Sequence, residues 1–165
     1  MKRTPGRAPL AIGDSVMLGA VPQLTRAGYE VDARGCRQIG QGLDLMRARR
    51  RAGTLPRLVV LALGTNASIT TSHLRSALAI AGPDRVLGLV TPRETGGSGG
   101  ADATVVRRFA RRHPGRAALL DWVRVSAGNG GWFAGDGIHL GAGGARGLAR
   151  LLRQALPLAA PVPCP

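Results

Sequence analysis

Two short segments at opposite ends of the chain carry side chains that could perform chemistry together. Gly13-Asp14-Ser15 follows an apolar run near the N-terminus, and Asp136 and His139 stand three residues apart near the C-terminus. A serine hydroxyl becomes nucleophilic when an imidazole accepts its proton, and a carboxylate on the other ring nitrogen orients that imidazole. These residue types predict acyl transfer through a serine, if the fold brings the two segments together.

Each segment taken alone also has a simpler structural explanation. A serine between a strand and a helix is a common helix N-cap. Asp136 and His139 could form an ordinary turn or half of a metal site, but no further His or Cys has the spacing to complete one. The glycine-rich stretch 141–147 lacks the Lys-Ser/Thr of a phosphate loop. We therefore predict no metal and no cofactor, and the chemical interpretation depends on the combination of segments.

The segments that must position these residues alternate between strand and helix. Strands are expected over 10–12, 29–33, 58–63, 86–90 and 117–122, and helices over 15–26, 43–51, 70–81, 101–112 and 142–156. The strands lack period-two alternation, which indicates a parallel sheet covered on both faces. We expect a three-layer α/β/α sandwich with a central, mostly parallel five-stranded sheet. Loops at the carboxyl ends of its strands should then bring Ser15, Asn66 and the segment after Trp122 to one rim.

The length of the chain bounds its organisation. The 165 residues suffice for one core, and we expect a single domain over 9–156, a flexible N-terminus over 1–8 and a Pro-rich tail over 157–165. No apolar stretch approaches the ~20 residues that span a bilayer, and the start shows no signal-peptide pattern. The chain as given is predicted to be soluble, with its compartment left open. Cys36 and Cys164 have no metal-ligand spacing and are not expected to pair.

The charge of the chain is strongly basic. Its formal net charge is +14, almost all from arginine. Such a charge could favour an anionic partner such as a cell-wall polymer, although a genome with Arg-rich codon usage explains the same composition. The aromatic residues are too few and too dispersed for base stacking, which argues against nucleic acid. The Gly-Ser segment 96–100 is expected to be a surface loop, with an active-site lid as the alternative.

The motifs and their order resemble those of the SGNH/GDSL hydrolase family. Gly13-Asp14-Ser15 matches the first block of that family, Gly64-Thr65-Asn66 the third, and Asp136 with His139 the fifth. The chain looks most similar to the SGNH domains of peptidoglycan O-acetyltransferases, in stretches that include 31–33, 90–93 and 132–140. The resemblance extends from about residue 9 to residue 156 and implies the SGNH hydrolase fold, which is flavodoxin-like. Val16 and Ala67 stand where the broader family often has Leu and Asp.

The resemblance implies roles for the three residues of the opening paragraph. Ser15 would be the nucleophile, His139 the general base and then acid, and Asp136 the carboxylate that orients the imidazole. The oxyanion hole would comprise the Ser15 N–H, a backbone N–H from the second block and the Asn66 side-chain amide. The two remaining histidines, His73 and His113, are expected to be solvated and outside the site.

The second block aligns through Arg37-Gln38. Its oxyanion donor then falls on Cys36, with Gly35 just before it, so Cys36 is interpreted as a backbone contributor or, alternatively, as a buried structural thiol. Arg37 and Gln38 could line the pocket or brace this block, and Trp132 is a further pocket candidate.

The resemblance implies a serine esterase that removes acetyl or another short acyl group from a carbohydrate or small ester. Two alternatives remain open. One is an O-acetyltransferase acting on cell-wall polysaccharide, with a separate membrane partner supplying acyl groups. The other is a non-catalytic basic module that holds an anionic polymer.

Overall fold

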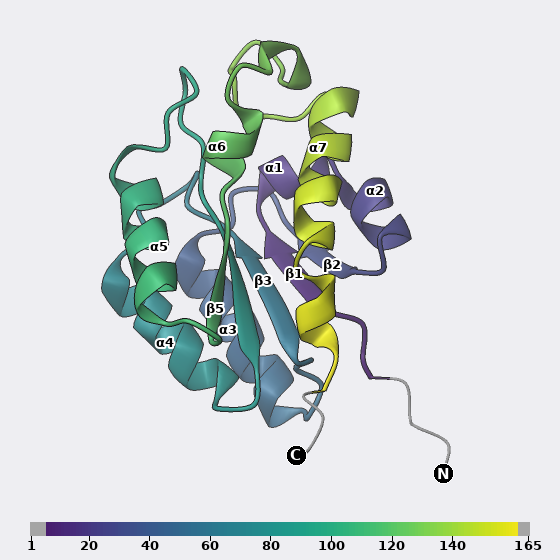
Figure 1. The fold of residues 1–165 in the computed structure, drawn as a ribbon, viewed down its shortest axis with the longest axis vertical. Helices are drawn as coiled ribbons and strands as arrows, with labels where there is room; N and C mark the ends of the chain where they lie inside the picture. Colours follow the sequence, from purple (N-terminus) through teal and green to yellow (C-terminus); the bar gives the residue numbers. More distant parts are fainter. Residues whose placement is uncertain (1–5, 162–165) are drawn as a thin grey trace.

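Five parallel strands form the centre of the protein, as seen in a computed structural model that describes residues 6–161 (Figure 1). The strands are β1 (Leu10–Gly13), β2 (Glu30–Ala33), β3 (Leu58–Ala62), β4 (Val86–Val90) and β5 (Ala117–Leu120). Their order is β2-β1-β3-β4-β5, and every pairing is parallel. The predicted five-stranded sheet is confirmed. Cys164 and most of the predicted N-terminal segment lie outside the described residues.

Helices cover both faces of this sheet, and Figure 1 shows them as two separate layers. One layer contains α3 (Ile39–Arg51), α4 (Thr71–Ala81) and α5 (Gly100–Arg112). The other contains α1 (Ser15–Leu18), α2 (Val21–Arg26), α6 (Trp122–Ser126) and α7 (Ala142–Arg153), with the short 3₁₀ helices η1 (Gly130–Trp132) and η2 (Leu156–Ala159). The expected three-layer sandwich is therefore confirmed. No helix within residues 6–161 is long and apolar enough to cross a membrane.

Successive side chains of a buried strand point to opposite faces of the sheet, so the hydrophobic core has two parts, one beneath each helix layer. Val59 and Leu61 of β3 pack with the α3–α5 layer, whereas Leu58 and Val60 pack with the α1–α7 layer. Since both faces of the strand are buried, its sequence is continuously apolar. The order of strands reverses between β1 and β3, and loops at such a point form a crevice at the carboxyl edge.

The first predicted helix, over 15–26, is wrong as a single element. The structure divides it into α1 and α2, with a break at Gly19 and Ala20. Pro22 stands in the first turn of α2, where its missing N–H costs no hydrogen bond. The same proline would interrupt a helix arriving from Ser15, which explains the break.

Two other predicted helix boundaries shift for local reasons. The helix expected over 43–51 begins at Ile39, because Gln38 and Gln41 form a reciprocal capping pair that starts it earlier. The helix expected over 142–156 ends at Arg153, and η2 follows as a separate turn.

Candidate active site

Ser15 is the first residue of α1, directly after β1. Asp14 is the N-cap: its Oδ1 accepts a hydrogen bond from the Val16 N–H at 3.0 Å. The alternative that Ser15 itself caps the helix is therefore wrong. With the cap supplied by its neighbour, the Ser15 hydroxyl is free to turn outward, and its Oγ lies 3.0 Å from Nε2 of His139.

Asp136 and His139 form one compact turn. The Oδ1 atom of Asp136 accepts the N–H groups of Ile138 at 2.9 Å and His139 at 3.0 Å, while its Oδ2 lies 2.5 Å from His139 Nδ1. Gly137 supplies the positive φ of 72° that the turn requires. The carboxylate therefore occupies one ring nitrogen of the imidazole and leaves the other facing Ser15.

The contacts of this turn also set the charge of its carboxyl group. The hydrogen bond from the His139 side chain, followed by the two backbone N–H groups, lowers the pKa of Asp136 to about 2. Asp136 is therefore an anion throughout the pH range in which an imidazole titrates. A permanent negative charge beside the imidazole stabilises its protonated form.

Asp14 contributes to the site as a structural support. It is 1% exposed, and burial is the main reason why its pKa is raised above the ordinary value. Its second oxygen, Oδ2, lies 3.4 Å from Nδ2 of Asn66, the asparagine that follows β3. Asp14 thus joins the loop after β1 to the loop after β3.

Asn66 also contacts the loop after β2. Its Nδ2 donates to the backbone oxygen of Arg37 at 3.3 Å, so three loops from adjacent strands meet at this amide. Gly64 allows the loop after β4 to approach as well: it has a φ of 121°, and a Cβ added there would lie 2.9 Å from Pro92. The predicted meeting of Ser15, Asn66 and the segment after Trp122 at one rim is confirmed, since Asn66 contacts Asp14 and His139 contacts Ser15.

The loop after β2 makes a tight turn at Gly35 and Cys36. Both are exposed, so the alternative of a buried structural thiol is wrong. Cys36 has a φ of 58°, in the left-handed region that non-glycine residues rarely occupy. Within the described residues neither Gly35 nor Cys36 has a hydrogen-bond acceptor for its backbone N–H. Unusual backbone geometry with free donors is a common property of functional sites.

Arg37 braces this loop. Its buried guanidinium donates to the Gly13 oxygen at 3.3 Å, to the Asp32 backbone oxygen at 2.6 Å and to Asp32 Oδ1 at 2.7 Å. Gln38 is occupied as the cap of α3. The contacts of both residues are thus internal, as the bracing alternative expects, and neither lines a cavity beside Ser15.

Trp132 holds the chain that leads into the Asp136–His139 turn. Its ring stacks on Trp122 at 5.8 Å and lies against a strip of glycines on α7. A Cβ added at Gly147 would lie 2.5 Å from the Trp132 ring, and one added at Gly144 would lie 2.3 Å from its backbone oxygen. The glycines of 141–147 therefore form a seat for Trp132, which lines neither cavity beside Ser15.

Arg93, three residues after β4, contacts the Asp136–His139 turn, although the motif analysis did not single it out. Its Nε donates to the Gly137 oxygen at 2.8 Å, its Nη1 donates to Ser126 Oγ at 2.9 Å, and its guanidinium lies 4.0 Å from the centre of the Phe133 ring. These contacts bind the Asp136–His139 turn to the sheet. The only signal in the sequence was its place directly after a predicted strand, in the stretch 90–93.

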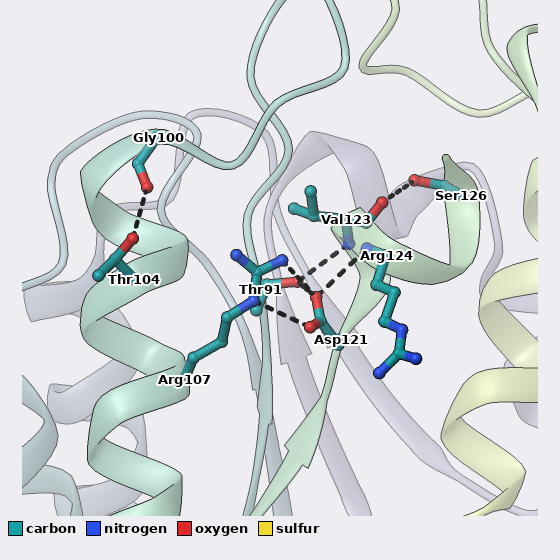
Figure 2. A network of polar contacts seen from close by, with 8 residues as sticks. All are labelled: Thr91, Gly100, Thr104, Arg107, Asp121, Val123, Arg124 and Ser126. Atoms are coloured by element: carbon teal, nitrogen blue, oxygen red, sulfur yellow. Dashed lines mark hydrogen bonds and ion pairs between the residues drawn. The ribbon is translucent and has the colours of Figure 1, made fainter. Parts of the chain in front are cut away.

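A polar network centred on Asp121 joins the ends of β4 and β5 to α5 and α6 (Figure 2). Asp121 accepts two hydrogen bonds from Arg107, both at 2.9 Å, and one from Thr91 at 3.0 Å. Burial opposes its ionisation, but these bonds and the Arg124 N–H outweigh burial and lower its pKa. Asp121 caps α6, a helix absent from the sequence predictions, so the strand expected over 117–122 ends at Leu120 instead.

A polar cavity of about 500 Å³ opens beside the Asp136–His139 turn. Its walls come from the loop after β3, the loop after β4, the start of α5 and Ile138. Asn66, Glu94 and Asp102 contribute polar groups to it. Oxygen-rich walls of this kind suit a ligand that carries hydroxyl groups.

The remaining histidines lie on the opposite layer. His73 caps α4 in a reciprocal pair with Thr70, and His113 ends α5 with its ring stacked on Phe109. Both are half-buried and bonded internally, so the expectation that they are solvated is only partly correct. Their position outside the site is confirmed. The described residues contain no group of three or more His, Cys, Asp or Glu suited to a metal ion.

The chain is similar in sequence to peptidoglycan O-acetyltransferases, although no family model matches it. It is 30% identical over 149 residues to the putative peptidoglycan O-acetyltransferase YrhL of Bacillus subtilis, covering 89% of this chain and 23% of that protein. It is 29% identical over 148 residues to O-acetyltransferase OatA of Staphylococcus aureus, covering 88% of this chain and 24% of that protein. The chain thus spans about a quarter of these relatives.

Solved structures resemble this protein over nearly the full length of both chains. The C-terminal catalytic domain of peptidoglycan O-acetyltransferase A from Streptococcus pneumoniae, solved with a methylsulfonyl adduct, superposes with a TM-score of 0.80 at 26% identity, covering 93% of this chain and 94% of that one. A family 3 carbohydrate esterase from Clostridium thermocellum has a TM-score of 0.70 at 12% identity, covering 92% and 96%, and so shares the fold. The chain has the α/β fold of its SGNH/GDSL hydrolase neighbours, and its relatives in sequence are peptidoglycan O-acetyltransferases.

Proposed function

We propose that this protein moves a short acyl group, such as acetyl, through a covalent ester on Ser15. The observation that carries the proposal is the continuous line of contacts from Ser15 Oγ to His139 Nε2, at 3.0 Å, and from His139 Nδ1 to Asp136 Oδ2, at 2.5 Å. This is the relation that a serine nucleophile, its general base and an orienting carboxylate need.

In the acylation step, Ser15 Oγ attacks the carbonyl carbon of the ester while His139 Nε2 accepts the hydroxyl proton. The resulting imidazolium is stabilised by the Asp136 carboxylate, which remains ionised because its pKa is about 2. Collapse of the tetrahedral intermediate breaks the ester bond, and His139 returns the proton to the departing alcohol. The acyl group then remains on Ser15 as an ester.

The negative oxygen of the intermediate needs hydrogen-bond donors. We assign these to the Ser15 N–H at the start of α1, to the Gly35 or Cys36 N–H, and to the Asn66 amide. The N–H groups of the β2 loop have no acceptor within the described residues, and the bonds of Asn66 are long, at 3.3 and 3.4 Å. Each such donor contributes about 3 kcal/mol to transition-state stabilisation.

The acyl-enzyme is resolved by a second nucleophile, which His139 deprotonates as it enters. Water gives hydrolysis, and a carbohydrate hydroxyl gives transfer with the same bond changes in reverse order. The polar 500 Å³ cavity beside Ile138 has room for a sugar ring, and the named relatives are peptidoglycan O-acetyltransferases. We therefore place an acylated or acyl-accepting carbohydrate in that cavity. A separate membrane partner would supply the acyl groups for transfer.

A test of this function uses an activated acetyl ester, with mass spectrometry of the protein quenched during turnover. We expect release of the alcohol and an acetyl adduct on the peptide that contains Ser15. Ser15→Ala should abolish both, whereas Ser72→Ala, which changes an exposed serine on α4, should alter neither. Equal turnover by wild type and Ser15→Ala would contradict the proposal. Adding a carbohydrate acceptor then separates the two outcomes: acetylated sugar indicates transfer, and acetate alone indicates hydrolysis.

A further inference from the structure

A groove outside the active site gathers arginines from two helices. It has a volume of about 270 Å³ and is lined by Arg26 of α2 and by Arg146, Arg150 and Arg153 of α7, together with Gln23 and Ala149. We call it the arginine groove. We propose that it binds a linear polymer whose negative charges are phosphodiesters.

The positive charge of the arginine groove is not neutralised by any of the residues that the structure describes. Neither α2 nor α7 contains an acidic residue. All four arginines are exposed, and within residues 6–161 none of them forms an ion pair or a side-chain hydrogen bond. Like charges gathered at one site repel one another, so an anion that enters the groove gains favourable interactions with several guanidinium groups at once.

Several other arginines of the chain behave differently. Arg50, Arg85 and Arg116 each donate to backbone carbonyl groups around the end of α4. Arg37 and Arg93 are likewise occupied by contacts within the protein. The arginine-rich composition alone does not separate these two groups, but the structure does. One group stabilises the fold, whereas the N–H donors of the arginines in the groove remain available to a ligand.

The geometry of the groove favours an extended ligand with tetrahedral anionic groups. Arg146, Arg150 and Arg153 follow one face of α7 at intervals of four and three residues. At 1.5 Å per residue the row is about 10 Å long, more than one small anion covers. Arg26 faces them from α2. A phosphodiester can direct oxygens to both walls, and guanidinium groups bind phosphate oxygens in pairs.

The residues that line the groove also argue against nucleic acids and lipid membranes as its partners. None of its lining residues is aromatic, so it offers no surface on which nucleic-acid bases could stack. Ala149 is its only apolar lining residue, so no large apolar side chain is available there to enter a lipid layer. A hydroxyl-bearing phosphodiester polymer needs neither feature. Gln23 lines the wall, and its buried side-chain oxygen has no hydrogen-bond partner within the described residues.

The arginine groove lies in the layer that carries the proposed nucleophile. α7 begins three residues after His139, and α2 follows α1; Figure 1 shows α2 beside α7. A polymer seated in the groove could therefore extend toward Ser15. That last step rests on the proposed acyl transfer, whereas binding in the groove does not.

The test measures binding of a fluorescent poly(glycerol phosphate) to the full chain by anisotropy at low and moderate salt. The variant Arg146→Gln/Arg150→Gln/Arg153→Gln should weaken binding by about tenfold or more and reduce its salt dependence. A matched control removes the same charge elsewhere: Arg75→Gln/Arg108→Gln/Arg112→Gln, in the separate groove between α4 and α5. The control should lose no more than about threefold, as expected for the change in net charge.

Equal losses in the two triple variants would overturn the proposal, because binding would then follow net charge alone. Tighter binding of a single-stranded oligonucleotide or of phosphatidylglycerol vesicles than of the polymer would also overturn it. The single change Arg150→Glu gives a second reading if a triple variant folds poorly, and it should weaken binding more than Arg108→Glu does. Turnover of a small activated ester is measured in parallel and should be the same in every variant. If the wild-type protein does not turn over the ester, the proposed function is contradicted. The result of the binding measurement would stand separately.

Discussion

Arg93 donates a hydrogen bond from Nε to the carbonyl oxygen of Gly137 over 2.8 Å, which joins the end of β4 to the turn carrying Asp136 and His139. The other end of the same guanidinium holds Ser126, a fully buried residue at the end of α6. The turn that carries the imidazole is therefore tied to a residue 44 positions before Gly137. We expect Arg93 to act as a positioning residue for the Asp136–His139 turn.

Arg93→Met should lower kcat by about ten- to a hundredfold, since a displacement of about 1 Å at reacting groups has an effect of this size. The measurement is steady-state hydrolysis of an activated acetyl ester across pH. Arg93→Lys should restore part of the loss, because an ammonium can reach one acceptor but cannot span Gly137 and Ser126. An unchanged kcat with an unchanged pH profile would show that the turn holds its geometry without Arg93.

Asp136→Asn should lower kcat by about four orders of magnitude, because an amide can hold the imidazole in the wrong tautomer. Its backbone-accepting oxygen is retained, so the turn itself should persist. Thermal unfolding measured alongside turnover would separate loss of catalysis from loss of structure. A large drop in melting temperature would mean that the change acts on the fold instead.

The pKa of Asp136 makes a separate prediction for pH. Its value of about 2 lies below the ordinary 3.8, so the ionised form is favoured by the folded turn. The contribution of Asp136 to stability should be fully present above about pH 4 and be lost as pH falls toward 2. The carboxyl carbon of Asp136, followed by NMR, should titrate near pH 2. A midpoint near pH 4 would mean that the bonds to His139 and the backbone are absent in solution.

Gly147→Ala should destabilise the protein by about 1–3 kcal/mol and lower its turnover, because a Cβ there would lie 2.5 Å from the Trp132 ring. The matched control is Gly40→Ala on α3, where a Cβ meets nothing within 4 Å. Alanine in that open helical position should leave stability unchanged or raise it by about 0.5–1 kcal/mol. Chemical denaturation gives the free energy of unfolding of both variants. Similar changes in the two variants would contradict the role assigned to the glycines that pack against Trp132.

Cys36→Ser should retain turnover to within about twofold, whereas Cys36→Val should reduce it, because a β-branched residue is strained at a φ of 58°. The two substitutions separate a backbone donor from a reactive thiol. Turnover of the acetyl ester, with circular dichroism as a check on folding, is the measurement. Inactivation by Cys36→Ser would show that the thiol takes part in the reaction.

The five-stranded parallel sheet could be predicted from the sequence, and so could the candidate residues of the site. Apolar runs such as 58–62 are continuous because both faces of a central parallel strand are buried, and that pattern can be recognised locally. Ser15, Asp136 and His139 could be assigned their expected roles because the order of the motifs that contain them resembles that of the SGNH/GDSL hydrolases. Their placement beyond strand ends followed from the direction that parallel strands share.

The residues that support this site became visible only in the folded protein. Arg93 and Trp132 act through partners far along the chain, Gly137 and Gly147, and no local pattern reports such contacts. The arginine groove likewise exists only because α2 packs beside α7, since its four charges come from segments more than a hundred residues apart. Local propensity and periodicity describe single elements, whereas long-range packing chooses which elements meet and therefore which side chains share a site.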